Sequence, residues 1–380
     1  MSWPKVPFET IYEVSSRNGI YKTKEFHGSG VKIVNMGELF GFEFIGNQEM
    51  NRVQMRDVEL ERDGLVDGDL LFGRRSLVES GAGKCSIVLN ATEPLTFESS
   101  IIRVRLDKSK AIPLFYYYWF KSHIGRAGIR AIVSGTNVKG IRGSDLKNVS
   151  LALPPIDCQK RIVEVCKNYD DLIENNRRRI QLLEESARLL YKEWFIHLRF
   201  PGHEHVKIVD GVPEGWAEKT LGEVIVLHYG KALKADDRVP GPYPVYGSSG
   251  VIGFHEKFLV KGPAIVLGRK GNVGSVFWCA KDFFPIDTVY FIESSSSSLY
   301  LYLALQKMKF INTDVAVPGL NRDMAYSRKI LIPNPSLLTA FLREVEPMQQ
   351  QIEKLAEYNN KLAEARDLLL PRLMNGELTL

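Results

Sequence analysis

The sequence predicts an α+β protein in which two α/β heads are separated by two long helices that form an antiparallel coiled coil, with an internal pseudo-two-fold repeat. Over residues 162–194 and 341–373, apolar side chains recur at alternating steps of four and three, which is the spacing of a coiled-coil seam. The two stretches also correspond, because Pro154 and Pro333 precede them at a constant offset of 179 residues and every seam position maps onto another. Short β-like runs between glycines precede each stretch.

The elements follow in order along the chain. Residues 1–153 form the first head, whose aromatic run 111–120 we interpret as a buried helix. Residues 154–200 form the first long helix, residues 201–216 a Gly- and Pro-containing linker, and residues 217–335 the second head. Residues 336–380 form the second long helix. We expect strands near residues 31–36, 69–72, 86–89, 101–106, 244–246, 264–267, 276–278 and 288–292.

One antiparallel register places the seam residues of the first long helix opposite those of the second along the whole length. In this register, paired residues have numbers that sum to 535. It sets Asn176 opposite Asn359, so that each amide can satisfy the other, whereas an isolated buried amide costs about 1–3 kcal/mol. The same register sets Trp194 opposite Phe341 and Tyr169 opposite Arg366. The predicted seam residues are Ile173, Asn176, Ile180, Leu183, Ile352, Leu355, Asn359 and Leu362. The alternative is that each helix packs on its own head or on another subunit.

Composition narrows the class of protein without naming a function. The 380 residues are 44% hydrophobic and 25% charged, and the net charge of +5 permits an anionic partner without requiring one. The four cysteines form no CxxC pair, which favours free thiols in a reducing cytoplasm. No signal peptide or membrane-spanning run is visible, so we expect a cytoplasmic protein. His203 and His205 lack further spaced ligands, and we predict no metal site.

Several sequence motifs, spread over nearly the full length of the chain, resemble those of the specificity (S) subunit of type I restriction–modification systems. They are Leu153-Pro-Pro-Ile-Asp-Cys-Gln159, Leu190-Tyr-Lys-Glu-Trp-Phe195, Val212-Pro-Glu-Gly-Trp216, Tyr243-Pro-Val-Tyr-Gly-Ser-Ser-Gly250, Ile265-Val-Leu-Gly-Arg-Lys-Gly-Asn-Val-Gly274 and Leu370-Pro-Arg-Leu-Met-Asn-Gly-Glu-Leu378. The resemblance implies that each head is a target recognition domain for one half of a split site in double-stranded DNA. It implies that the helices are a spacer and a docking surface for two methyltransferase (modification) subunits. A motor–nuclease (restriction) subunit would join the complex, and this chain would carry neither catalysis nor a cofactor.

The length of the helices suits this function, because 33 residues of α-helix span about 50 Å and one turn of B-DNA spans about 34–36 Å. Base reading requires Arg, Lys, Asn or Gln on loops that can enter the major groove. In the first head we expect DNA contacts from Arg74, Arg75, Asn137, Lys139 and Arg142. In the second head we expect them from Tyr246, Ser248, Arg269, Lys270, Asn272, Asn321 and Arg322. Arg269 and Lys270 rank first, because Gly268 and Gly271 flank them and permit close approach.

Alternatives remain open at this point. Each predicted contact residue could instead be an ordinary exposed loop residue or an ion-pair partner. Residues 110–150 carry seven Lys and Arg against the single acid Asp145, and this basic region is either a solvated surface or a phosphate-binding patch. The whole chain could be a coiled-coil protein-interaction adaptor that does not bind specific DNA. A stand-alone methyltransferase fits less well: Phe26-His-Gly-Ser-Gly30 matches an S-adenosylmethionine motif, but no N/D-P-P-Y/F element accompanies it.

Overall fold

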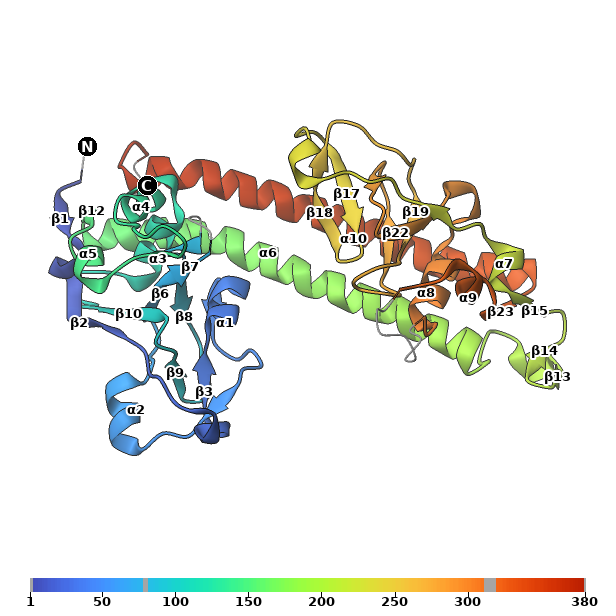
Figure 1. The fold of residues 1–380 in the computed structure, drawn as a ribbon, viewed down its shortest axis with the longest axis horizontal. Coiled ribbons are helices and arrows are strands. Elements are labelled where there is room, and N and C mark those ends of the chain that lie inside the picture. The colour runs from blue at the N-terminus through green and yellow to red at the C-terminus, as the bar shows by residue number, and fades with distance from the viewer. Residues whose placement is uncertain (1–2, 78–80, 311–318, 379–380) are drawn as a thin grey trace. The chain divides into compact units, whose positions relative to one another are not determined.

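A computed structural model describes residues 3–77, 81–310 and 319–378. The chain divides into two compact units: unit 1 comprises Met1–Glu174 with Asn359–Leu380, and unit 2 comprises Asn175–Tyr358. The long helices α6 (Ile156–Tyr191) and α10 (Pro335–Met374) each contribute to both units (Figure 1). Each unit therefore consists of one head and a part of each long helix. Within the described residues, no helix is both long and apolar enough to cross a membrane.

Unit 1 contains a five-stranded sheet and a three-stranded sheet. The larger sheet has the order β2-β10-β6-β8-β4, with β2 Tyr12–Asn18, β10 Ile101–Leu106, β6 Leu70–Gly73, β8 Cys85–Val88 and β4 Phe44–Ile45. The smaller has the order β5-β3-β9, with β5 Arg52–Val53, β3 His27–Val34 and β9 Leu95–Phe97. Two further pairs are β1 (Lys5–Pro7) with β12 (Ser150–Ala152), and β7 (Arg75–Ser76) with β11 (Lys139–Gly140). Its short helices are α1 Met36–Gly41, α2 Asp57–Asp63, α3 Pro113–Lys121, α4 His123–Arg130 and α5 Gly143–Leu146.

Unit 2 is built from the same kinds of sheet. The larger has the order β16-β22-β19-β20, with β16 His228–Tyr229, β22 Val289–Ile292, β19 Ala264–Gly268 and β20 Val276–Cys279. The smaller has the order β18-β17-β21, with β18 Gly250–His255, β17 Tyr243–Gly247 and β21 Phe284–Pro285. The remaining pairs are β15 (Ala217–Thr220) with β23 (Lys329–Ile332), and β13 (Ile208–Val209) with β14 (Val212–Pro213). The short helices are α7 Leu221–Val224, α8 Leu299–Lys307 and α9 Arg322–Tyr326.

The two heads correspond strand by strand, so the predicted internal repeat is confirmed and extends beyond the stretches where the sequences agree. In both, four antiparallel strands share one order, and the middle strand of the small sheet has one antiparallel and one parallel neighbour. Gly19 and Gly230 occupy equivalent places after β2 and β16. A Cβ atom on Gly19 would lie 2.2 Å from the Phe97 carbonyl oxygen, and one on Gly230 would lie 2.0 Å from that of Ile286. Both positions therefore exclude any side chain.

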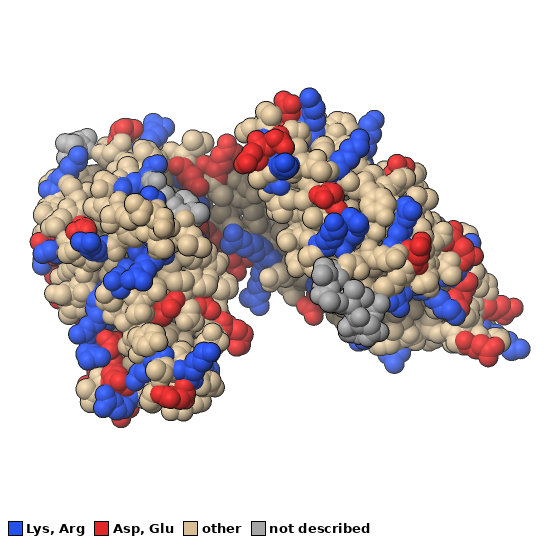
Figure 2. Space-filling view, in the orientation of Figure 1, with Lys and Arg blue, Asp and Glu red and all other residues tan. Residues whose placement is uncertain are grey.

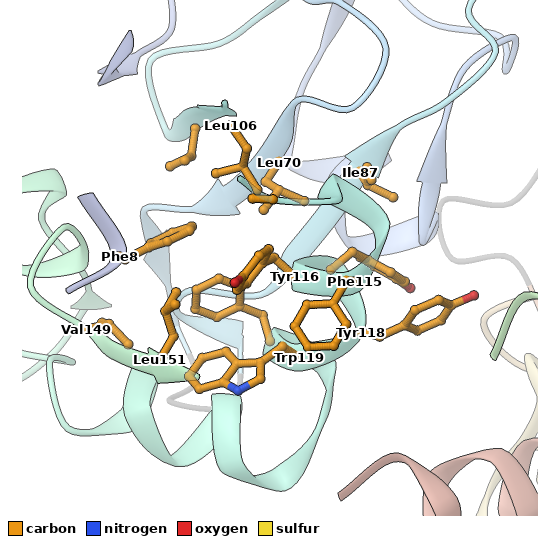
Figure 3. Packing of buried hydrophobic residues seen from close by; sticks show 14 of the residues in the cluster. Phe8, Leu70, Ile87, Leu106, Phe115, Tyr116, Tyr118, Trp119, Val149 and Leu151 are labelled. Atoms are coloured by element: carbon orange, nitrogen blue, oxygen red, sulfur yellow. The ribbon is translucent and has the colours of Figure 1, made fainter. Parts of the chain in front are cut away.

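All eight strands expected from the sequence are present, and the aromatic run is a buried helix. Pro113 begins α3, where its missing N–H costs nothing, and every residue from Phe115 to Phe120 is buried. Figure 3 shows Phe115, Tyr116 and Trp119 close to side chains of the sheet and of β12. Ile162 and Cys166 of α6 and Leu370, Leu373 and Met374 of α10 belong to the same hydrophobic cluster. The core of unit 1 thus closes only with side chains from both long helices.

The long helices pair antiparallel, as predicted. In unit 2 the Trp194 ring, just beyond the end of α6, lies 5.7 Å from the Phe341 ring near the start of α10, the pair that the register sets opposite. In unit 1 the Arg366 guanidinium, which the register sets opposite Tyr169, donates to the carboxylate of the next residue, Asp170. All eight predicted seam residues are buried or half-buried. Asn176 and Asn359 belong to different units, and their pairing stays a prediction.

Candidate nucleic-acid interface

In unit 2, two segments far apart in the sequence meet at the end of β19. Lys270, just after the strand, forms an antiparallel bridge with Gly319, and the Leu320 N–H donates to the Arg269 carbonyl at 2.8 Å. An open cavity of about 390 Å³ lies beside this pairing. Its walls carry four of the predicted contact residues together with two tyrosines: Arg269, Lys270, Asn321, Arg322, Tyr229 and Tyr290.

Tyr229 arranges two arginines in this cavity. The guanidinium carbon of Arg269 lies 5.0 Å from the centre of the Tyr229 ring, and that of Arg322 lies 5.4 Å from the same ring. These are cation–π distances, at which the aromatic face attracts a cation. Arg269 also donates to the Asp287 carbonyl at 3.1 Å and is half-buried, whereas Arg322 is exposed. Arg269 is thus anchored by the protein, and Arg322 presents its guanidinium to solvent from the first turn of α9.

Tyr290 and Asn321 hold the second segment in place. The buried hydroxyl of Tyr290 donates to the Leu320 carbonyl at 3.0 Å, and burial raises its pKa, so it remains a donor at neutral pH. The side-chain oxygen of Asn321 accepts the Asp323 N–H at 2.8 Å and so caps α9. Asp323 also lines this cavity, and its negative charge offsets part of the positive charge there.

Of the remaining three predicted residues of unit 2, Asn272 lies in the neighbouring glycine loop 268–274, Ser248 lies beside it in the turn between β17 and β18, and Tyr246 belongs to β17. Tyr246 packs against the ring of Phe283 at 5.5 Å, and Ser248 is only 8% exposed. The Ser248 hydroxyl accepts the Asn272 N–H at 3.4 Å and thereby braces the loop. Gly271 has φ +78°, a conformation that favours glycine, so the loop can turn at this position. Asn272 is exposed in this loop and Ser248 supports it, whereas Tyr246 is held in β17 against Phe283.

In unit 1, pairing between β7 and β11 brings together the five predicted residues of the first head. Gly140 pairs with Arg75, and Lys139 pairs with Ser76. Asn137 lies in the turn between the bridged residues Ser134 and Gly140. Arg75, Asn137 and Arg142 are exposed, and Arg74 and Lys139 are half-buried. Residues separated by more than sixty positions in the sequence therefore form one polar edge.

The two sets of predicted residues occupy the same position of the repeat. In unit 1 the Arg74 carbonyl accepts the Ile141 N–H at 3.0 Å, as the Arg269 carbonyl accepts the Leu320 N–H in unit 2. Arg142 then precedes α5, as Asn321 precedes α9. The backbone framework is thus shared, and the side chains that it presents differ between the heads.

The basic region of residues 110–150 is largely occupied by internal contacts. Three lysines form ion pairs, Lys110 with Asp107, Lys121 with Glu43 and Lys147 with Glu9. Arg126 donates to the carbonyls of Gly83 and Ala82 at 3.0 and 3.3 Å. Among the described residues, Arg130, Lys139 and Arg142 have no ion-pair partner. On the face drawn in Figure 2, Lys and Arg are spread over both units and interrupted by Asp and Glu.

The sequence reasoning missed Tyr229 and Tyr290. Tyr229 is 48% exposed and lies directly before Gly230 at the end of β16, and an aromatic residue next to a glycine is the local signal in the sequence. An exposed aromatic ring offers a flat surface for an arginine. Its arginine partners come from two distant segments, so only the fold reveals the contact.

Comparison with known proteins places the chain in a family. The model described as "Type I restriction modification DNA specificity domain" matches residues 3–185 and again residues 213–358. The chain is 24% identical to the type I restriction enzyme MjaIX specificity subunit of Methanocaldococcus jannaschii, over 94% of this chain and 89% of that protein. It is 22% identical to the type I restriction enzyme HindI specificity subunit of Haemophilus influenzae, over 92% and 94%.

A solved structure supports the fold. The type I restriction–modification S subunit from M. genitalium superposes with a TM-score of 0.56 at 19% identity, over 98% of this chain and 96% of that one. Because the family model covers both heads and much of both long helices, the chain belongs to the type I restriction modification DNA specificity domain family.

Proposed function

We propose that this protein is the DNA sequence-specificity subunit of a type I restriction–modification complex. Each head reads one half of a bipartite site, and the two long helices set the spacing between the halves. The observation that carries the proposal is that the polar edge of unit 1 and the cavity of unit 2 occupy the same position of the repeat. The backbone framework is the same in both heads, and the side chains on it differ. Such a pair of sites suits two unlike DNA half-sites better than a protein-interaction adaptor does.

The subunit itself performs no chemistry in this proposal. Two methyltransferase subunits dock on the long helices, and the restriction subunit joins the assembly. Exposed apolar side chains on α6, Leu172, Leu182 and Leu189, give the helix a surface that a partner helix can cover. Double-stranded DNA is held by arginine and lysine contacts to phosphates and by base contacts in the major groove.

The test is to co-express this chain with the methyltransferase of its own host and to map methylated adenines over the genome. The expected result is a bipartite motif with a fixed gap, which disappears when this chain is omitted. Replacing residues 1–153 by another head should change one half of the motif and leave the other unchanged. A methylation pattern that is the same with and without this chain would instead support the adaptor.

A matched pair of variants tests the polar edge of unit 1. Arg75→Ala with Arg142→Ala removes two exposed guanidiniums and should weaken recognition of one half-site. The slope of log binding constant against log salt should fall by about one for each of these arginines that touches a phosphate. The control is Lys147→Ala with Lys110→Ala, which removes the same charge from lysines that already have acidic partners. Equal effects of the two pairs would argue against a DNA contact at this edge.

A further inference from the structure

The polar edge of unit 1 and the cavity of unit 2 share a backbone framework but differ in one aromatic residue. Tyr229 pairs with Tyr290 in the β16-β22 ladder, as Asn18 pairs with Ile102 in the β2-β10 ladder. Asn18 is thus the counterpart of Tyr229. The first head has no aromatic ring at this place, and the second head has one that contacts two guanidiniums.

The geometry of the second site separates the two arginines by task. Arg269 is half-buried, donates to the Asp287 carbonyl and also lies 5.7 Å from the Tyr290 ring. It therefore fixes the ring of Tyr229 from the protein side. Arg322 is exposed on that ring at the mouth of the cavity. An arginine held against a ring loses less conformational freedom when it binds a ligand than an unsupported one does.

The donor pattern of Arg322 fits a base edge. A guanidinium held against an aromatic ring presents a directed pair of N–H donors, and guanine offers the matching pair of acceptors, O6 and N7, in the major groove. The same fork also fits two phosphate oxygens. Three cations, Arg269, Lys270 and Arg322, line the cavity together with Asp323. Lys270 is exposed and is a point charge that suits a phosphate, which leaves the oriented fork of Arg322 for the base edge.

Resting on the function proposed above, we propose that Arg322 reads a guanine in the half-site of the second head, and that Tyr229 is the positioning residue that holds it. Arg322 specifies one G·C pair through its two donors. Tyr229 supplies the aromatic ring, and Arg269, anchored by the Asp287 carbonyl, contacts the same ring. The first head, with Asn18 at the equivalent place, reads its half-site without this support.

The experiment uses the complete complex of this chain with its methyltransferase. Binding is measured to duplexes in which each base pair of the second half-site is replaced in turn. The variants are Arg322→Lys, Tyr229→Leu and Tyr229→Phe, with Asn18→Leu as the matched control in the first head. Arg322→Lys keeps the charge but removes the paired donors, so discrimination at one G·C pair should fall about 10- to 100-fold, since tenfold corresponds to 1.4 kcal/mol.

Tyr229→Leu should relax discrimination at the same G·C pair. Tyr229→Phe should retain most of it, because the ring is kept; this rescue is not expected if Tyr229 acts only through its hydroxyl. Asn18→Leu should leave that base pair unaffected. In the three variants of the second head, base-pair discrimination in the first half-site should match that of the wild type. This match also serves as the control that the chain is folded.

Three outcomes would overturn the inference. A second half-site without any G·C pair excludes a guanine contact. Equal weakening of all duplexes by Arg322→Lys, or no change at all, shows a phosphate contact or none. In each of these three cases the wild-type complex still methylates a bipartite site, so the proposed function survives. If the wild-type methylation pattern does not depend on this chain, the proposed function fails together with the inference.

Discussion

A buried ionic cluster in unit 1 allows one prediction to be worked through in detail. Asp170 of α6 and Arg366 of α10 are 7% and 6% exposed, and they form an ion pair. The Tyr118 hydroxyl of α3 donates to the other carboxylate oxygen of Asp170 at 2.6 Å. Burial and the Asp170 carboxylate raise the pKa of Tyr118, so the hydroxyl keeps its proton. The cluster therefore joins the head to both long helices.

Removing one member of this cluster should cost more than removing the pair. Asp170→Ala leaves the buried guanidinium with Asp367, whose side chain is 56% exposed, as its remaining ion-pair partner among the described residues. Breaking a buried pair in this way costs about 3–5 kcal/mol. Tyr118→Phe deletes a neutral donor to a charged acceptor and should cost about 1.5–3 kcal/mol. The double variant Asp170→Leu with Arg366→Met should lie within about 2 kcal/mol of the wild type, because no charge is left unpaired.

Hydrogen–deuterium exchange of peptides from α3 measures the opening free energy of unit 1 without requiring the whole chain to unfold in one step. The matched control is Gln349→Ala, 179 residues after Asp170 at the equivalent position of the repeat. Gln349 is half-buried and donates to Glu353, so we expect a change of less than about 1 kcal/mol in unit 2. A cost below about 1 kcal/mol for Asp170→Ala, or a double variant equal to the sum of Asp170→Leu and Arg366→Met measured singly, would refute the reasoning.

Three further predictions concern backbone, pH and thiol chemistry. Gly230→Ala should destabilise unit 2 by about 2 kcal/mol or more, because the new Cβ would lie 2.0 Å from the Ile286 oxygen; Gly37→Ala, with nothing within 4 Å, is the control in thermal unfolding. A backbone hydrogen bond from Arg56 and the Lys22 ammonium lower the pKa of Glu59 from 4.5 to about 2, so its stabilising effect is complete above pH 4.5 and is lost as pH falls through this window. The stability difference between wild type and Glu59→Gln should shrink accordingly on acidification, and a constant difference would contradict the assignment. Burial raises the pKa of Cys166 to about 12, so in a Cys166-only variant a disulfide reagent at pH 8 should react at the rate of unfolding; fast reaction of the folded protein would contradict this.

The sequence predicted the elements that periodicity encodes. The heptad spacing was sufficient to place Trp194 opposite Phe341, and alternation between glycines was sufficient for the strands. Periodicity did not predict the partner of Arg366, because a register sets positions opposite each other without deciding which way a long side chain turns. A carboxylate one residue from Tyr169 offered the guanidinium a stronger partner than the ring.

The candidate site was predictable only in part, for a related reason. Arg269 and Lys270 stand between glycines, which is a local signal. Their position beside Arg322 in one cavity depends on the bridge between Lys270 and Gly319, and the position of Tyr229 depends on the pairing of β16 with β22. Both are long-range pairings that no local pattern encodes. Whether the twelve predicted residues touch DNA stays a prediction.

The shared core of unit 1 has a consequence for how the protein is made. The first head is synthesised early, but its hydrophobic cluster includes Leu370, Leu373 and Met374, which leave the ribosome only after the second head has been made. Until then, the apolar surface that they cover is open to chaperones and proteases. A product of interrupted translation carries the first head with an incomplete core and is a substrate for degradation. Synthesis of the whole chain is in this way a precondition for a stable first head, and the cell is spared a subunit that recognises half a site.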